Sequence, residues 1–290
     1  MKRIAILGCE NSHADAFLTS ILIEKKYTDI EVVGVYTNEP EAEERMKKNF
    51  GVYCAKSYDE FVGRVDGIMI TARDGVNHYK YAKPYIAMGI PMFIDKPITS
   101  DNGEAVEFMK ELKANGCRVC GGSSCACTPH VLSLSDTVAG IPKEDIYGGF
   151  LRAPVSMNNI YGGFYFYAQH LAEVLLKIFG YYPKSVKAYT NANVTSIVVR
   201  YDEYDILAEY VDGNYMYYAY ASTKEGLIGG EYPVNSSIYE HELQNFYSLL
   251  SGGEQKISYR DFIAPVFLIS AIKKSIDTGA EVELERIGEI

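Results

Sequence analysis

The first 120 or so residues alternate short β-branched runs with segments of helical periodicity, and this alternation constrains the fold more than any other feature of the chain. It is typical of parallel βαβ units whose sheet is covered by helices on both faces. We therefore expect an N-terminal Rossmann-type, doubly wound parallel sheet. Its strands are predicted at residues 4–7, 32–36, 68–71, 92–94 and 118–121.

Helices are predicted between these strands. Apolar residues recur at helical spacing over residues 17–22, and a second helix over 39–50 has Asn38 as its expected N-cap. A third helix covers residues 79–88, and Asp101 or Asn102 is the expected cap of a fourth that reaches residues 115–116.

Beyond about residue 122 the pattern changes, which predicts a Rossmann domain over residues 1–121 and a separate α/β domain over 122–290. A helix over 166–178 precedes several strands and two closing helices. Strands at 206–210 and 215–221 flank an Asp-Gly-Asn turn, which favours a hairpin in an antiparallel or mixed sheet. Since no flexible linker separates the halves, the expected site is a cleft between them.

The charge balance limits the classes of ligand. A net charge of −10 argues against nucleic acid, which binds clustered Lys and Arg, so a small-molecule substrate is expected. No apolar run suits a signal peptide or a membrane-spanning helix, so the expected location is the cytoplasm, without membrane contact. Six cysteines in such a chain are expected to be unpaired thiols.

The turn after the first predicted strand has the sequence Gly-Cys-Glu-Asn-Ser-His over residues 8–13. A dinucleotide-binding turn would show G-x-G-x-x-G, of which only Gly8 remains. Glu10 replaces the second glycine, and its carboxylate would repel a pyrophosphate unless it points away, as we expect. The turn alone leaves nucleotide binding and a purely structural connection equally open.

The end of the second predicted strand lacks the acid that NAD-binding folds usually carry there. Thr37 and Asn38 stand in its place, and a neutral tip tolerates the 2′-phosphate of NADP. These residues predict that NADPH binds at least as well as NADH, although helix capping by Asn38 explains them equally well.

Asp95-Lys96-Pro97 follows a buried strand, which brings Lys96 to the carboxyl edge of the sheet, where doubly wound folds bind ligands. This segment and the preceding His78-Tyr79 helix resemble the Glu-Lys-Pro region of the Gfo/Idh/MocA oxidoreductase family. The likeness continues through residues 122–129, similar to that family's domain-crossing segment, and through His170, similar to its inward histidine. Residues 240–275 resemble its terminal helices.

The resemblance implies a nicotinamide cofactor, NAD or NADP, with Lys96 and His170 meeting at a substrate carbon. The family often carries Asp four residues before the histidine, whereas this chain has Phe166, so Tyr167 or Tyr165 is the candidate replacement. The candidate catalytic residues are Lys96, His170 and Tyr167. The candidate cofactor-binding residues are Gly8, Glu10, Asn11, Ser12, His13, Thr37, Asn38, Thr71, Ala72, Arg73, His78, Asp95 and Lys96.

The expected activity is therefore hydride transfer between NAD(P) and a hydroxyl-bearing sugar, inositol or related polyol. The alternative is a catalytically silent ligand-binding or sensing protein on the same fold, which the degraded glycine turn and Phe166 favour. The family likeness and a tyrosine-rich second domain also point to a homo-oligomer formed through the C-terminal sheet.

Four cysteines lie close together in the sequence, at positions 117, 120, 125 and 127, with His130 nearby. Thiolate and imidazole are suitable zinc ligands, but the spacing is not that of a paired zinc knuckle. We expect buried thiols that behave as small apolar side chains, and no metal.

Overall fold

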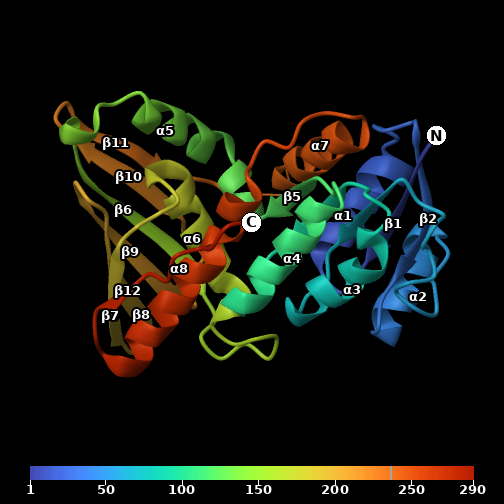
Figure 1. Ribbon diagram of the computed structural model, residues 1–290, viewed down its shortest axis with the longest axis horizontal. Coiled ribbons are helices and arrows are strands. Elements are labelled where there is room, and N and C mark those ends of the chain that lie inside the picture. Colours follow the sequence, from blue (N-terminus) through green and yellow to red (C-terminus); the bar gives the residue numbers. More distant parts are fainter. Residues whose placement is uncertain (236) are drawn as a thin grey trace.

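The computed structural model describes residues 1–235 and 237–290 and contains two β-sheets, each with its own helices (Figure 1). The first sheet has five strands in the order β2-β1-β3-β4-β5, and all its pairings are parallel. This confirms the predicted doubly wound sheet. The strands are β1 (Lys2–Leu7), β2 (Ile30–Tyr36), β3 (Gly67–Ile70), β4 (Met92–Asp95) and β5 (Val119–Gly122).

Helices cover both faces of the first sheet because its residues alternate between two cores. Ile4 and Ile6 pack with α1 (Ser12–Leu18), which continues as a π-helix (Thr19–Ile23), and with α2 (Pro40–Phe50). Ala5 and Leu7 belong to the core on the other face, with α3 (Val76–Ile86) and α4 (Asn102–Ala114).

Two predicted helix caps have different outcomes. Asp101 caps α4 by accepting a hydrogen bond from the Glu104 amide, as expected. The expected cap Asn38 is wrong: the N-cap position of α2 is Glu39, whose amide donates instead to the hydroxyl of Thr37. Thr37 performs this role because its short side chain lies two residues before the donor, the geometry of a hydroxyl turn.

The second sheet is mixed, as predicted, with the strand order β11-β10-β6-β9-β8-β7-β12. Among the described strands of this sheet, only β6 and β9 pair in parallel. The strands are β6 (Ile146–Val155), β7 (Ser185–Asn191), β8 (Val194–Arg200), β9 (Asp205–Asp212), β10 (Tyr218–Thr223), β11 (Gly226–Glu231) and β12 (Val282–Glu283).

The predicted hairpin between residues 206–210 and 215–221 is wrong. Both strands exist, as β9 and β10, but β6 lies between them and pairs with each. Gly213 makes the expected turn with a φ of +73°, yet a turn fixes only a local change of direction. The ten-residue strand β6, which the sequence did not reveal, takes the central place.

Three helices cover one face of the second sheet, on the side toward the first sheet (Figure 1). They are α5 (Pro129–Ala139), which the sequence analysis missed, α6 (Tyr165–Phe179) and α8 (Tyr259–Thr278). The predicted helix over 166–178 is α6, and Gly180 ends it as expected. The fourth helix, α7 (Ile238–Leu250), returns to the first domain and contacts α1 and β5.

The opposite face of the second sheet is open. Directly paired residues place Tyr218, Tyr220, Phe150 and Leu207 on it, and the Leu207 side chain is 53% exposed. Tyr218 and Tyr220, two residues apart on β10, therefore line one half-exposed sheet face.

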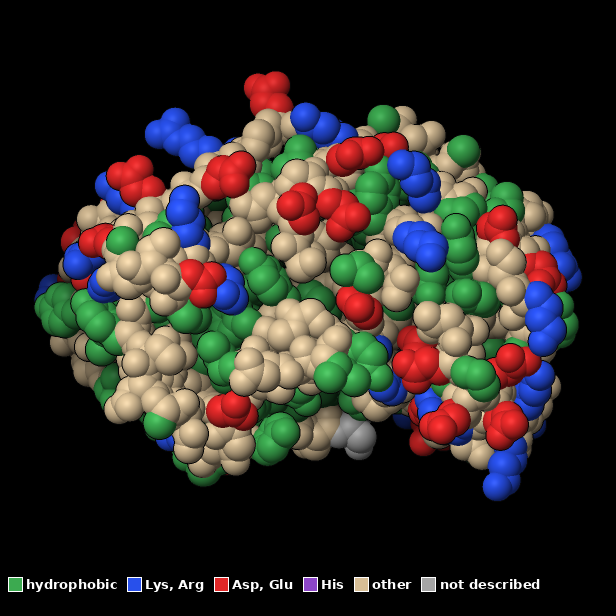
Figure 2. Space-filling view, turned by 90° about the horizontal axis from the view of Figure 1, so that it is seen from below, with side chains coloured by type: hydrophobic (Ala, Val, Ile, Leu, Met, Phe, Trp, Pro, Cys, Tyr) green, Lys and Arg blue, Asp and Glu red, His purple; other side chains and the backbone are tan. Residues whose placement is uncertain are grey.

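The predicted domain boundary at residues 121 and 122 falls within β5 and stays a prediction. Among the described helices, none combines the length and the apolar character needed to cross a membrane. Acidic and basic side chains are interspersed with apolar ones on the face shown in Figure 2.

Candidate functional site

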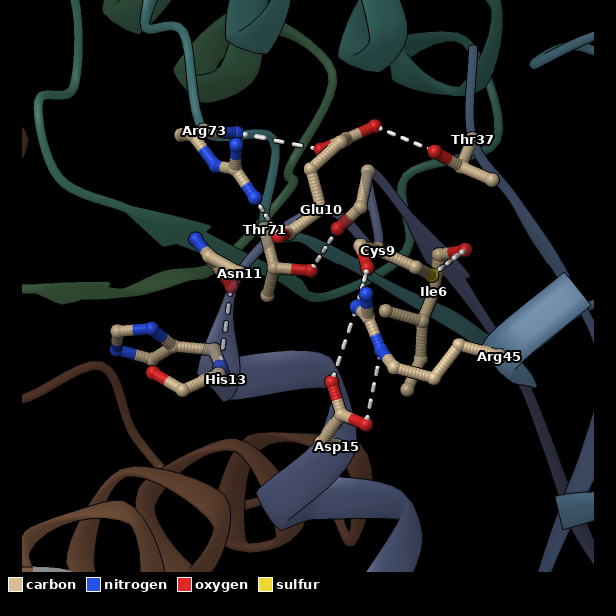
Figure 3. A network of polar contacts seen from close by, with 12 residues as sticks. Ile6, Cys9, Glu10, Asn11, His13, Asp15, Thr37, Arg45, Thr71 and Arg73 are labelled. Atoms are coloured by element: carbon tan, nitrogen blue, oxygen red, sulfur yellow. Dashed lines mark hydrogen bonds and ion pairs between the residues drawn. The ribbon is translucent and has the colours of Figure 1, made fainter. Parts of the chain in front are cut away.

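The candidate residues of the N-terminal domain gather at the carboxyl edge of the first sheet. Gly8 follows β1 with a φ of +86°, and a Cβ atom on it would lie 2.3 Å from the Cα atom of Ala72. The Thr71 hydroxyl, just past β3, donates to the carbonyl of Gly8 (Figure 3). The loops after β1 and β3 approach each other so closely that only glycine fits at position 8.

Glu10 points its carboxylate toward the end of β2 (Figure 3). The side chain is buried and accepts hydrogen bonds from the Thr37 hydroxyl at 2.7 Å and from the Arg73 amide at 3.3 Å. The Arg73 guanidinium donates to the Glu10 carbonyl and, at 2.7 Å, to the Tyr161 hydroxyl. Tyr161 belongs to the C-terminal half, so Arg73 connects the two domains over this loop.

Asp95 is the centre of a buried polar cluster. Its carboxylate accepts from Asn11 Nδ2 at 3.0 Å and lies 3.2 Å from His13 Nδ1. The other ring nitrogen of His13 lies 3.3 Å from a carboxylate oxygen of Glu242, on α7. Burial alone would lower the pKa of His13, but the charges of Asp95 and Glu242 outweigh it and raise that pKa above its usual value. Through these two contacts His13 joins α7 to the loop after β1.

Ser12 is exposed and contacts the same C-terminal region. Its hydroxyl lies 2.8 Å from the hydroxyl of Tyr239, the second residue of α7. A hydroxyl can make more than one hydrogen bond, so Ser12 can keep this contact and still bind a ligand.

Lys96 and α6 form the part of the site between the domains. The Lys96 ammonium lies 4.4 Å from the ring centroid of Phe166 and 5.6 Å from that of Tyr167. Aromatic faces attract cations, so Phe166 stabilises the ammonium without the negative charge of the family's Asp. Only 7% of Lys96 is exposed.

His170 lies one helical turn after Phe166, with its Nδ1 atom 2.7 Å from the Ser123 hydroxyl. Burial, reinforced by the positive charges of Lys96 and His13, lowers the pKa of His170 well below its usual value, so the imidazole is neutral near pH 7. The rings of Tyr167 and His170 are 5.3 Å apart. Burial raises the pKa of the Tyr167 phenol, which therefore keeps its proton and can donate a hydrogen bond.

Glu173, which the sequence analysis did not single out, joins this site. Its carboxylate accepts from the Ser123 amide at 2.8 Å and from Gln169 Nε2 at 2.9 Å. Burial raises its pKa to about 8, against the lowering effect of these two hydrogen bonds. An acid three residues after His170 on an apolar helix is the signal that could have revealed it. Glu242 lies within residues 240–275, but no sequence pattern connected it with His13.

Two candidate cofactor residues lie differently from the rest. Asn38 is exposed beyond the end of β2. His78 is fully buried on α3, with Nε2 2.9 Å from the carbonyl of Ala72, and burial lowers its pKa. His78 therefore positions the backbone of the loop after β3 through its contact with the Ala72 carbonyl.

The six cysteines are all free thiols. Burial raises the pKa of Cys125 and of Cys127 to about 12, which disfavours the thiolate that binds zinc. Across the described residues, no three His, Cys, Asp or Glu side chains are grouped to hold a metal ion.

The residues at this edge fit a dinucleotide. A tight turn without a side chain follows β1 at Gly8, and a carboxylate and a hydroxyl, from Glu10 and Thr37, stand at the end of β2. Dinucleotide-binding sheets have a tight turn and a ribose-binding acid at these two places. Lys96 and His170 lie at the other end of the site, where Lys96 packs on α6 and His170 belongs to that helix.

Residues 2–123 match the model of an oxidoreductase family described as having an NAD-binding Rossmann fold, the Gfo/Idh/MocA family. No curated protein matches the chain.

Solved structures match the chain over nearly its whole length. They include scyllo-inositol dehydrogenase from Lactobacillus casei, with a TM-score of 0.83, 14% identity and 98% of each chain covered. Myo-inositol dehydrogenase from Corynebacterium glutamicum has a TM-score of 0.79, 16% identity and 99% of each chain covered. An oxidoreductase from Agrobacterium radiobacter, in complex with NAD+, L-tartaric acid and magnesium, has a TM-score of 0.76 and 13% identity, with 97% of this chain and 98% of that chain covered.

At such identities the solved structures show the shared fold, and the family model adds the sequence match in the N-terminal domain. Residues 2–123 therefore carry a sequence match to the Gfo/Idh/MocA family of oxidoreductases, and along its whole length the chain has the fold of the solved structures that it resembles.

Proposed function

We propose that the chain is an NAD(P)-dependent oxidoreductase that transfers hydride between a nicotinamide and a hydroxyl-bearing carbon of a sugar, inositol or related polyol. The observation that carries the proposal is the arrangement of Lys96 and His170, which come from different domains and both contact Tyr167. The inositol dehydrogenases of the same fold support the substrate class, and the complex of the Agrobacterium enzyme with NAD+ supports the cofactor.

The nicotinamide, when bound, supplies the hydride acceptor, and the side chains handle the remaining charge and proton. Oxidation of an alcohol leaves negative charge on its oxygen, which the Lys96 ammonium stabilises. Neutral His170 has one ring nitrogen held by Ser123, and its other nitrogen is the candidate acceptor for the hydroxyl proton. Tyr167 keeps its own proton and serves as a donor that orients the substrate.

The first test is fluorescence titration of the purified protein with NADH and NADPH, followed by a screen of polyols with the oxidised cofactors. On an active substrate, we expect Lys96→Ala to lower turnover by about a hundredfold or more, with a smaller loss of cofactor affinity. His170→Ala should lower turnover by at least about a hundredfold. Lys110→Ala, which changes an exposed lysine on α4, is the control and should keep full activity.

Full activity of Lys96→Ala would contradict the catalytic assignment even though the fold stands. A loss of less than about tenfold in His170→Ala would reduce that residue to a positioning role.

The second candidate function is a catalytically silent protein that binds a polyol in the same place. Phe166 favours it, because an aromatic ring covers Lys96 where the family often carries a proton-handling Asp. Saturable binding of a polyol by calorimetry, without binding of either nicotinamide, would select this function over the oxidoreductase.

We also propose that the chain forms a homo-oligomer through the open face of the second sheet, which carries Tyr220 and Leu207. Leu207→Glu should shift the mass measured by light scattering toward the monomer. Ile160→Glu, at an exposed residue outside that face, should not. A monomeric wild type would refute the interface. The six free thiols support a reducing compartment, the cytoplasm, for this protein.

A further inference from the structure

We propose that Glu10 binds the 2′-hydroxyl of the adenosine ribose and thereby makes the protein select NAD(H) over NADP(H). The inference rests on the proposed function and assigns the acid to the turn after β1 instead of the end of β2. It reverses the cofactor preference expected from Thr37 and Asn38 alone.

The first step is where the Glu10 carboxylate lies. NAD-binding folds place an acid near the end of the second strand, where it accepts a hydrogen bond from the ribose hydroxyl. Here β2 ends at Tyr36, and the Glu10 carboxylate is bonded to the hydroxyl of the next residue, Thr37, at 2.7 Å. The negative charge missing from the strand end is thus supplied from the neighbouring turn (Figure 3).

The second step is how firmly the carboxylate is held. The Thr37 hydroxyl accepts from the Glu39 amide at 3.2 Å and donates its proton to one oxygen of Glu10. The Arg73 amide donates to the other oxygen at 3.3 Å. Each carboxylate oxygen can accept a further hydrogen bond, so a ribose hydroxyl has an acceptor that is already oriented.

The third step concerns the neighbouring cations, because an arginine at this place can accommodate a 2′-phosphate. The Arg73 guanidinium donates to the Glu10 carbonyl and the Tyr161 hydroxyl. The Arg45 guanidinium donates to the Cys9 carbonyl at 2.5 Å and to Asp15 at 3.2 Å (Figure 3).

Both arginines therefore have other partners, and the ion pairs found in the described chain do not include Glu10. A 2′-phosphate would bring a charge of about −1.5 to −2 against this buried carboxylate, whereas a 2′-hydroxyl would donate a hydrogen bond to it.

The test is fluorescence titration with NADH and NADPH, which measures binding without a substrate. We expect the wild type to bind NADH at least about tenfold more tightly than NADPH. Glu10→Gln should weaken NADH binding by about tenfold and bring the two affinities within about threefold of each other. Thr37→Val, which removes the hydroxyl that holds Glu10, should reduce the preference in the same direction while keeping the charge.

Glu39→Gln is the matched control, because it removes an acid near the same strand end that lies 3.9 Å from Arg73. It should keep the preference for NADH. Circular dichroism and thermal unfolding establish whether each variant is folded. If Glu10→Gln does not fold, Thr37→Val still tests the proposal.

The outcomes separate this inference from the proposed function. Equal affinity of the wild type for both cofactors, or loss of the preference in Glu39→Gln, would overturn the role of Glu10 but leave the proposed function standing. Tighter NADH binding by Glu10→Gln would show that Glu10 obstructs the ribose, and would overturn it too. Absence of binding of either cofactor to the wild type would overturn the proposed function along with it.

Discussion

Glu173 gives a prediction in which the structure fixes the sign, the pH window and the size of an effect. The carboxyl group has a pKa of about 8 in the folded protein, against a usual value of 4.5. The folded state therefore holds its proton more tightly than the unfolded state does. The resulting contribution to stability is fully present below pH 4.5 and is lost as the pH rises through about 8.

The magnitude follows from the pKa. Each unit corresponds to about 1.4 kcal/mol, so a rise from 4.5 to about 8 corresponds to at most about 5 kcal/mol of unfolding free energy. Glu173 also borders a groove between α6, α7 and β5, where solvent reduces the cost of the charge. We therefore expect about 2 to 3 kcal/mol over this window.

Glu173→Gln is the perturbation, because glutamine can still accept from the Ser123 amide but does not titrate. Urea unfolding followed by circular dichroism from pH 5 to pH 9 would give the unfolding free energy of both proteins. The difference between variant and wild type should grow in favour of the variant as the pH rises. Glu225→Gln, at an exposed acid in the β10–β11 turn, should follow the wild type. Parallel profiles for Glu173→Gln and the wild type would refute the reasoning.

Three further predictions concern the buried contacts. Glu242→Gln removes one of the two charges that raise the pKa of His13. The stability that this raised pKa adds below about pH 6.5, and that is lost as the pH rises through the folded value, should therefore be smaller in the variant; urea unfolding at pH 6 and 8 measures the change. Gly8→Ala should cost about 3 kcal/mol or more, because its Cβ would lie 2.3 Å from Ala72 at a positive φ, and a thermal midpoint equal to the wild type would contradict this. Elemental analysis should find no stoichiometric zinc; zinc that disappears in Cys120→Ser would contradict the assignment of the cysteines as metal-free thiols.

The first sheet could be predicted from the sequence because most of its strands contain a short apolar run. In a parallel sheet covered on both faces, such runs and the helical patterns between them repeat along the chain. The position of Lys96 followed from the same logic, since a strand such as β4 carries the residue after it to the carboxyl edge. Local sequence patterns were sufficient here because, in a βαβ unit, segments that follow one another in the sequence also pack against one another.

The order of the strands in the second sheet and half of the site could not be predicted from local sequence patterns. β6 pairs with strands more than fifty residues away, and nothing local distinguishes its partners. The contact of His13 with Glu242 joins residues more than two hundred positions apart. Glu10 was identified as a departure from the glycine pattern, but its bond to Thr37 depends on how two loops meet in space.

The return of α7 to the first domain means that residues far along the chain complete this domain. Leu243 and Phe246 belong to the same core as Ile4 and Ile6, and a Cβ atom on Gly67 in β3 would lie 2.8 Å from the Leu250 side chain. A ribosome must therefore have released about 250 residues before α7 can complete the cover that α1 and α2 give to this face of the first sheet. Until then part of the apolar face stays uncovered on the growing chain, and a gene fragment that ends near residue 121 would produce a domain with that part unprotected from aggregation.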